Sequence, residues 1–190
     1  MTADAETTTT TTTTTNAFTL RTHRPGDMGW IVSRHGALYA QEYGWNERFK
    51  ALVARVTADF IDNYDPTSER CWIAERNNNR EFLGCVMVVK DRESSSSSSS
   101  SENSNNKTAK LRLLLVEPGA RGLGLGRTLV RECIQFAREA GYERIVLWTN
   151  SVLTAARRIY EREGFRMVTA EEHETFGVKS IGEYWELVIA

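Results

Sequence analysis

Four glycines stand within eight residues, from Gly119 to Gly126, where an apolar run ends and a helical pattern begins. The surrounding stretch, Val116 to Cys133, reads VEPGARGLGLGRTLVREC. The first amides of a helix have no intrahelical partner, and the helix dipole adds about half a positive charge there. Glycines before such an end let several N–H groups converge on one anion, typically a phosphate. We therefore predict either an anion-binding turn or, if the loop acts alone, a tight strand-to-helix connection.

Two common phosphate-binding loops do not fit this stretch. A P-loop needs Gly-Lys-Ser/Thr, but Gly126 is followed by Arg127, and Arg121 stands where the first glycine would be. A dinucleotide fingerprint starting at Gly124 would need glycine or alanine where the chain has Leu129.

Composition limits what else the chain can be. Its 190 residues suit one domain, and the net charge of −1 gives no reason to expect nucleic acid or an anionic membrane as a partner. Cys71, Cys85 and Cys133 form no Cys-x-x-Cys pair, and His23 and His35 have no metal-ligand spacing, so we expect reduced thiols and no metal. Without a long apolar stretch or a leader pattern, we expect a cytoplasmic protein, with a nuclear location left open.

Two tracts of low complexity interrupt the globular pattern. Residues 1–16 carry an unbroken threonine run, and residues 92–108 are rich in serine and asparagine. Neither supplies an apolar face, so we predict a disordered tail, a disordered loop and a single domain over residues 17–190.

The remaining chain divides into an antiparallel half and an alternating half. After the glycine loop, helices and strands alternate, which indicates an α/β fold with a partly parallel sheet covered on both faces. Asp27 is expected to cap the first helix. The expected strands are 18–24, 71–75, 82–89, 110–116, 144–148, 165–169 and 184–189, and the expected helices are 27–39, 46–63, one after the glycine loop and 153–163.

Arg121-x-x-Gly124-x-Gly126, followed by a helix, a buried strand and the stretch ARRIYEREGF (156–165), resembles the GNAT family of N-acetyltransferases. The resemblance implies a mixed sheet of six to seven strands, about four helices on its two faces and a splayed central strand pair. The stretches 24–27 and 43–45 look most like the acetyltransferase half of bacterial regulators that also carry a MarR-type winged helix.

The resemblance also implies acetyl-CoA as co-substrate and no metal. Arg121 would begin the pyrophosphate motif, and the main chain of Leu115 and Val116 would pair with the pantetheine arm. Leu153 stands where many members have an asparagine that contacts the pantetheine arm. Asn150, three residues earlier, could cap the following helix or contact the ligand. The amides around the pyrophosphate would be those of Gly122, Leu123, Gly124, Leu125, Gly126 and Arg127.

In the family, the tyrosine equivalent to Tyr160 acts as general acid toward the leaving thiolate. Glu117 could be the base, directly or through water, or simply a solvated strand end.

Exposed carboxylates in the expected acceptor region would favour a cationic amine, either a small molecule or a protein amine. A non-catalytic acyl-CoA sensor or interaction module is the alternative, and both a monomer and a homodimer stay open. The acceptor region comprises Glu42, Tyr43, Trp45, Glu47, Glu171, Glu172, His173 and Glu174.

Overall fold

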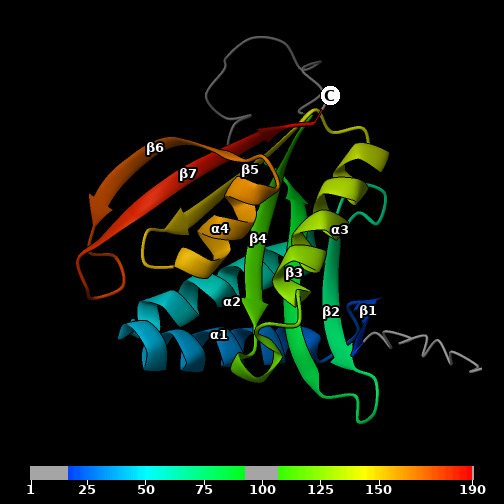
Figure 1. The fold of residues 1–190 in the computed structure, drawn as a ribbon, viewed down its shortest axis with the longest axis horizontal. Helices are drawn as coiled ribbons and strands as arrows, with labels where there is room; N and C mark the ends of the chain where they lie inside the picture. The colour runs from blue at the N-terminus through cyan, green and yellow to red at the C-terminus, as the bar shows by residue number, and fades with distance from the viewer. Residues whose placement is uncertain (1–16, 93–106, 190) are drawn as a thin grey trace, which may run out of the picture.

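The computed structural model describes residues 17–92 and 107–189, and Figure 1 shows their fold. The predicted threonine-rich tail and almost all of the predicted serine-rich loop lie outside the described residues. Among the residues that are described, every helix is too short or too polar to span a lipid bilayer.

Seven strands form one mixed sheet in the order β1-β2-β3-β4-β5-β7-β6. All neighbouring strands are antiparallel except β4 and β5, which are parallel. The predicted α/β fold with a mixed sheet is thereby confirmed. The strands are β1 (Phe18–Thr22), β2 (Arg70–Arg76), β3 (Phe82–Lys90), β4 (Thr108–Val116), β5 (Arg144–Asn150), β6 (Arg166–His173) and β7 (Ser180–Val188).

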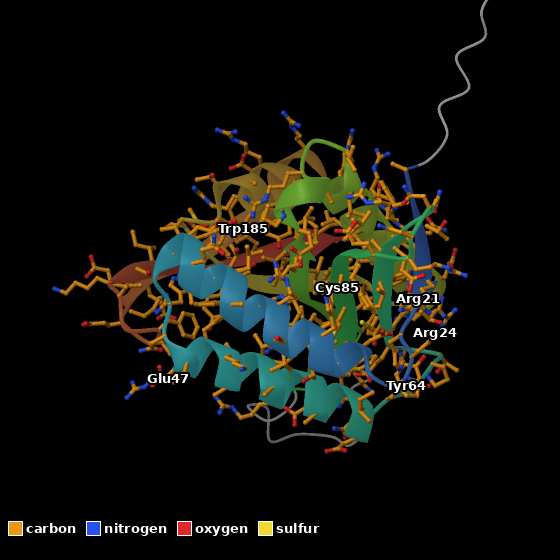
Figure 2. All side chains as sticks on the ribbon, turned by 90° about the horizontal axis from the view of Figure 1, so that it is seen from below. Arg21, Arg24, Glu47, Tyr64, Cys85 and Trp185 are labelled. Atoms are coloured by element: carbon orange, nitrogen blue, oxygen red, sulfur yellow. The ribbon has the colours of Figure 1, made fainter. Side chains whose placement is uncertain are left out.

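Four α-helices cover the two faces of this sheet. Helices α1 (Asp27–Tyr43) and α2 (Glu47–Asp62) lie side by side on one face, as Figure 2 shows. Helices α3 (Leu125–Glu139) and α4 (Thr154–Arg162) lie on the other face (Figure 1). A short 3₁₀ turn, Pro118–Ala120, leads from β4 toward α3.

The alternation of apolar residues along β2 and β3 divides the core into two layers. Ile73 and Met87 pack with α1 and α2, whereas Ala74 and Val88 pack with α3, because successive side chains of a strand point to opposite faces. All four side chains are fully buried. The central strands are therefore covered on both faces, as the sequence predicts.

The parallel pair β4–β5 is joined over only a short length. Thr108, Ala109 and Lys110 pair with Arg144 to Val146, and beyond Lys110 the two strands separate. Strand β5 instead pairs with β7 along its whole length. The sheet therefore opens in its middle, as expected from the family resemblance.

Several element boundaries differ from the prediction: α1 continues to Tyr43, β5 continues to Asn150, and β7 begins at Ser180. Asp27 does not cap α1, because Gly26 occupies the N-cap position in a left-handed conformation and Asp27 is the first helical residue. Strand β6 extends to His173, so Glu171 and Glu172 lie within the strand and do not follow it.

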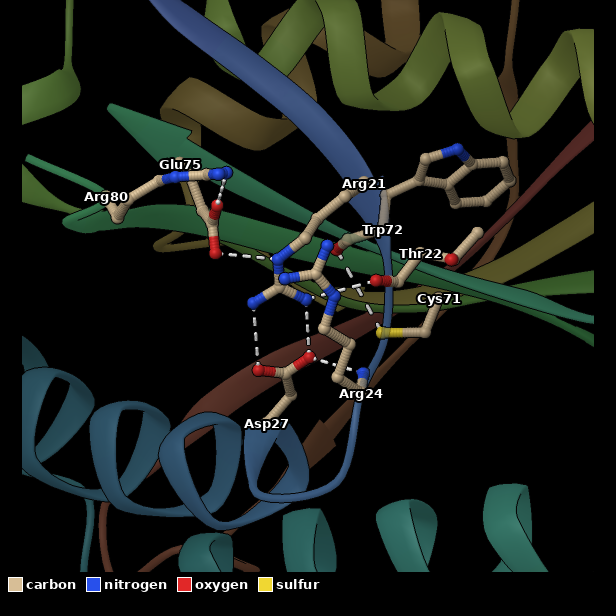
Figure 3. A network of polar contacts seen from close by, with 8 residues as sticks. All are labelled: Arg21, Thr22, Arg24, Asp27, Cys71, Trp72, Glu75 and Arg80. Carbon is tan, nitrogen blue, oxygen red and sulfur yellow. Dashed lines mark hydrogen bonds and ion pairs between the residues drawn. The ribbon is translucent and has the colours of Figure 1, made fainter. Parts of the chain in front are cut away.

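Asp27 instead belongs to a cluster of ion pairs that joins β1, α1 and β2 (Figure 3). The Arg21 guanidinium donates two hydrogen bonds to Asp27, of 2.6 and 3.0 Å, and one of 2.6 Å to Glu75. Asp27 also accepts a 2.6 Å bond from the Arg24 amide, and Glu75 accepts one from Arg80. Burial alone would raise the pKa of Asp27, but the hydrogen bonds and the Arg21 charge outweigh it and hold this pKa below its ordinary value.

We expect Asp27→Asn to lower the free energy of unfolding at pH 7 by about 3 kcal/mol, because Arg21 is largely shielded from solvent and loses one of its two charged partners. A depressed carboxyl pKa adds stability that is present above the unfolded-state pKa and is lost as pH falls through the folded-state pKa. The difference between wild type and variant should therefore shrink below about pH 4.

Urea unfolding at pH 7, 5 and 3 measures this difference, with the substitution Asp62→Asn at an exposed carboxylate as the matched control. A loss of stability that is the same at all three pH values would contradict the assignment to the Asp27 charge.

Candidate active site

A bulge in β4 turns this strand away from β5. Two residues of β4, Leu113 and Leu114, stand opposite the single residue Val86 of β3. Leu113 has a φ of 53°, in the left-handed region that residues other than glycine rarely occupy. The Cys85 thiol donates to the Leu113 carbonyl and the Tyr39 hydroxyl to the Leu114 carbonyl, each at 3.4 Å. Side chains of β3 and α1 thus hold the bulge in place, and a bulge of this kind bends its strand.

Past the bulge, Val116 is the β4 residue that turns its main chain toward the opening. The Glu117 N–H donates to the Leu83 carbonyl of β3 at 2.8 Å, and Leu115 pairs with Cys85 of the same strand. Since successive residues direct their polar groups to opposite sides, Leu115 faces β3 and Val116 faces away from it. Of the two residues predicted to hold the pantetheine arm, Leu115 therefore does not present its main chain to the opening.

A cavity of about 320 Å³ lies between the separated strands. Residues 110–114 of β4 form one wall, β5 and α4 form the other, and α1, α2 and the β6–β7 loop close its end. The wall is mostly apolar and aromatic. Its large side chains include Tyr39, Trp45, Phe49, Trp148, Tyr160 and Phe176.

Tyr160 enters the cavity from α4, and only 4 % of it is exposed. Leu153 and Ala156 line the same cavity. The ring packs 5.7 Å from Phe165 and 6.4 Å from Trp185, measured between centroids. Burial raises the pKa of Tyr160 far above its ordinary value. The phenol is thus protonated at any physiological pH, and it can donate a hydrogen bond.

The glycine loop has the bare backbone that the sequence predicts. Gly122 and Gly124 take positive φ values of 82° and 76°, and Gly124 is the N-cap of α3. A Cβ on Gly126 would stand 2.9 Å from Ile159 Cδ1, so no side chain fits between α3 and α4 without a shift. Within the described ranges 17–92 and 107–189, no acceptor takes a hydrogen bond from the amides of residues 122–127. The loop therefore offers a row of unused donors.

The arginines beside this loop are held by carboxylates of other elements. Arg121 donates to Glu42 of α1 at 2.7 Å. Arg127 and Arg131 donate to the two oxygens of Glu163 at 2.5 and 3.1 Å. Burial would raise the pKa of Glu163, but the two guanidinium groups hold it below its ordinary value. These pairs tie the loop to α1 and to the end of α4.

Glu117, the predicted base, forms a two-pronged ion pair with Arg34 of α1. Arg34 Nε lies 2.5 Å from one carboxylate oxygen and Nη2 lies 2.6 Å from the other. The bond to Glu117 raises the pKa of Arg34. Glu117 is not among the residues that line the cavity.

Asn150 does not cap α4, so that prediction is wrong. Strand β5 continues to Asn150, whose side-chain amide lies 2.9 Å from His173 Nε2, while its backbone carbonyl accepts from the Leu153 N–H. The N-cap of α4 is Leu153, which forms no side-chain cap. Contact between Asn150 and a ligand stays a prediction.

The carboxylates of the expected acceptor region do not line this cavity, and their preference for a cationic amine stays a prediction. Trp45 lines the cavity, but the predicted carboxylates are exposed and none of them does so. They lie at the facing ends of α1 and α2, on the exposed strand β6 or just after it, where solvent competes for them. The carboxylates concerned are Glu42, Glu47, Glu171, Glu172 and Glu174.

The sequence analysis missed His35, Tyr39, Phe49 and Phe176, which all line the cavity. The sequence did contain a signal for His35 and Tyr39. They stand four residues apart in the predicted helix 27–39, and residues at i and i+4 share one face of a helix. Phe176 lies on the β6–β7 loop and carries no comparable signal.

All three cysteines have free, buried thiols, as predicted for structural cysteines. Burial raises the pKa of Cys71, Cys85 and Cys133, which disfavours the nucleophilic thiolate. An acyl intermediate on a cysteine is therefore disfavoured.

Comparisons with known proteins agree with this geometry. The model of the acetyltransferase (GNAT) family matches residues 35–165. N-acetyltransferase 8F1 of Rattus norvegicus is 28 % identical over 144 residues, which cover 76 % of this chain and 57 % of that protein. An uncharacterized N-acetyltransferase of Schizosaccharomyces pombe is 30 % identical over 135 residues, covering 71 % of this chain and 74 % of that protein.

A solved structure shares the fold. The acetyltransferase yncA of Salmonella typhimurium, whose structure holds its cofactor acetyl-CoA, superimposes with a TM-score of 0.69 at 21 % identity, covering 92 % of this chain and 95 % of that chain. The family model covers well over half of the chain, and so this protein belongs to the GNAT family of acetyltransferases.

Proposed function

We propose that the protein transfers an acetyl group from acetyl-CoA to an amine by direct attack of the amine on the thioester. The observation that carries the proposal is the position of Tyr160, a buried and protonated phenol in the opening between β4 and β5. The unused amides of the glycine loop stand at the start of α3, directly after β4 in the chain.

The residues present fit a coenzyme with a diphosphate and an extended amide-rich arm. The amides of residues 122–127 would donate to the diphosphate, where the dipole of α3 favours negative charge. The main-chain groups of Val116 would pair with the arm as an added strand pairs with a sheet edge. Arg127 lies at the same helix end, but its ion pair with Glu163 offsets much of its charge there.

Transfer requires a proton donor for sulfur and a destination for the amine proton. The amine nitrogen forms a bond to the thioester carbon, and the Val116 N–H would polarise the carbonyl oxygen. As the carbon–sulfur bond breaks, Tyr160 would give its proton to the departing thiolate. The nitrogen then loses one proton, and Glu117 would receive it through water.

The alternative is a module that binds acyl-CoA without turnover. The observation that favours it is the Arg34–Glu117 ion pair, which occupies both oxygens of the proposed base. The finer likeness to MarR-linked acetyltransferases stays a prediction, as do the cytoplasmic location and the oligomeric state.

We expect Gly124→Ala to weaken coenzyme A binding by about tenfold. A side chain at its φ of 76° costs about 1–2 kcal/mol, and the loop would shift to relieve the strain. Titration calorimetry measures the affinity. Gly119→Ala is the matched control, because Gly119 has no positive φ and open space around its Cβ position. Equal affinities for the two variants would contradict the loop assignment.

Tyr160→Phe should lower kcat by a factor of about 10² and leave coenzyme affinity unchanged, because only the proton donor is lost. Release of free thiol from acetyl-CoA in the presence of an amine measures turnover. Full activity of the variant across pH 6–9 would remove Tyr160 as the acid. Binding of the coenzyme by wild type without any amine-dependent thiol release would favour the sensor module.

Glu117→Gln and Arg34→Gln separate a chemical role of Glu117 from a structural one. Each substitution breaks the same ion pair, but only Glu117→Gln removes a carboxylate. If Glu117 accepts the proton, kcat should fall by about 10² in Glu117→Gln and stay within a few-fold of wild type in Arg34→Gln. Equal losses in both variants would assign the pair a structural role.

A further inference from the structure

The cavity between β4 and β5 meets solvent at the hairpin formed by β6 and β7. Of the residues that line the cavity, only Thr175 and Tyr184 are exposed, and both belong to this hairpin. Phe176, the residue after Thr175, is 2 % exposed and lies at the aromatic end of the cavity. The mouth of the cavity and its closed end are therefore one residue apart in the chain.

Two segments meet over the closed end, and we call them together the clasp. One is the α1–α2 connection, residues 44–46, and the other is the β6–β7 loop, residues 174–179. The Asn46 N–H donates to the Phe176 carbonyl at 3.0 Å. The Trp45 ring packs 4.7 Å from the Phe176 ring and 4.6 Å from the ring of Phe49, measured between centroids. Trp45 is itself buried, so the clasp shields the aromatic end from water.

Gly177 allows the two segments of the clasp to approach this closely. It has a φ of 83°, and a Cβ built on it would stand 2.5 Å from Asn46 Nδ2. The Asn46 side chain is fixed from its other end, because its oxygen accepts the Arg48 N–H at 3.1 Å and caps α2. Contact between the segments at this point therefore requires glycine.

Few contacts hold the clasp shut. Among the described residues, the bond from Asn46 to Phe176 is the one hydrogen bond that joins the two segments, and the other contacts are between aromatic rings. The strand that leads into the loop is poorly packed as well, since β6 is exposed from Arg166 to Glu172. Segments with few buried contacts open locally at a small fraction of the free energy of global unfolding. The clasp can thus part while the sheet stays folded.

The proposed reaction needs two routes into the cavity. The coenzyme arm would lie beside Val116 and Tyr160, and the glycine loop that would bind its diphosphate is at the start of α3. The thioester would then fill the opening from the α3–α4 face of the sheet. The amine is left with the α1–α2 face, where Trp45 and Phe176 close the cavity.

We infer that the clasp is the gate through which the amine enters. In this arrangement the β6–β7 loop carries Phe176 away from Trp45, the amine passes beside Thr175 and Tyr184, and the loop closes again. Closure would exclude water, which competes with the amine for the thioester. The inference rests on the proposed function and adds the route of its second substrate.

A disulfide across the clasp tests the gate. The Cβ position of Gly177 lies 3.6 Å from Asn46 Cβ, and a disulfide spans about 3.5–4.5 Å between these atoms. We expect oxidation of Asn46→Cys/Gly177→Cys to lower the rate of amine acetylation at least about tenfold, because the loop can no longer lift. A phosphine reductant should restore the rate. Mass spectrometry of the acetylated amine, with a panel of primary amines, measures it.

The matched control is Asn46→Ser/Gly177→Cys, which carries the same strain at residue 177 and cannot form the crosslink. Calorimetry should give the same affinity for coenzyme A in the oxidised and reduced forms of the cysteine pair. Equal turnover in the two forms, or loss of coenzyme binding on oxidation, would overturn the gate and leave the proposed function intact. No turnover by the wild type with any primary amine would overturn both.

Amide hydrogen exchange of the wild type tests the gate without any substitution. The Asn46 N–H has its acceptor across the clasp, whereas Val53 lies in the middle of α2 and is fully buried. After correction for intrinsic rates, we expect the Asn46 amide to exchange at least about a hundredfold faster than the Val53 amide, because the clasp opens locally. Equal rates would mean that the clasp opens only when α2 unfolds, which would overturn the inference.

Discussion

The parting of β4 from β5 after Lys110 is the constraint on which the rest of this structure depends. A parallel pair would ordinarily continue along both strands and leave no room between them. Here the extra residue at Leu113 and Leu114 bends β4, and the polar groups of Val116 are left without a neighbouring strand. The opening lies next to the glycine loop and receives Tyr160 from α4. The bulge thus brings the main chain of Val116, the glycine loop and Tyr160 close together, although they lie in different segments of the sequence.

The features that could be predicted from the sequence are those encoded locally. Gly122 and Gly124 sit at a strand-to-helix turn that only glycine tolerates well, and the spacing of Gly124 and Gly126 from Arg121 is itself a motif. Tyr160 was predicted from the stretch ARRIYEREGF, which resembles the family at this point. Helices α2 and α3 were predicted because each buries a regular apolar stripe.

The features that could not be predicted depend on tertiary context. Leucine at 113 gives no sign that its backbone will be left-handed, since its contacts to β3 and α1 impose that conformation. The end of β6 was missed because both faces of the strand are exposed, so Glu171 and Glu172 show no alternation. Asn150 was assigned to a helix cap because such caps are common, whereas strand pairing with β7 extends β5 to include it.

The ion pairs around the glycine loop have a consequence for how an anion is attracted there. Arg121 and Arg127 already have carboxylate partners, Glu42 and Glu163, so much of their charge is neutralised at close range. Attraction at this end of α3 then comes mainly from oriented peptide dipoles, an effect that dissolved salt screens and that falls off within the first turn of the helix. Affinity for a polyphosphate should accordingly depend on close contact with the loop amides and fall as ionic strength rises.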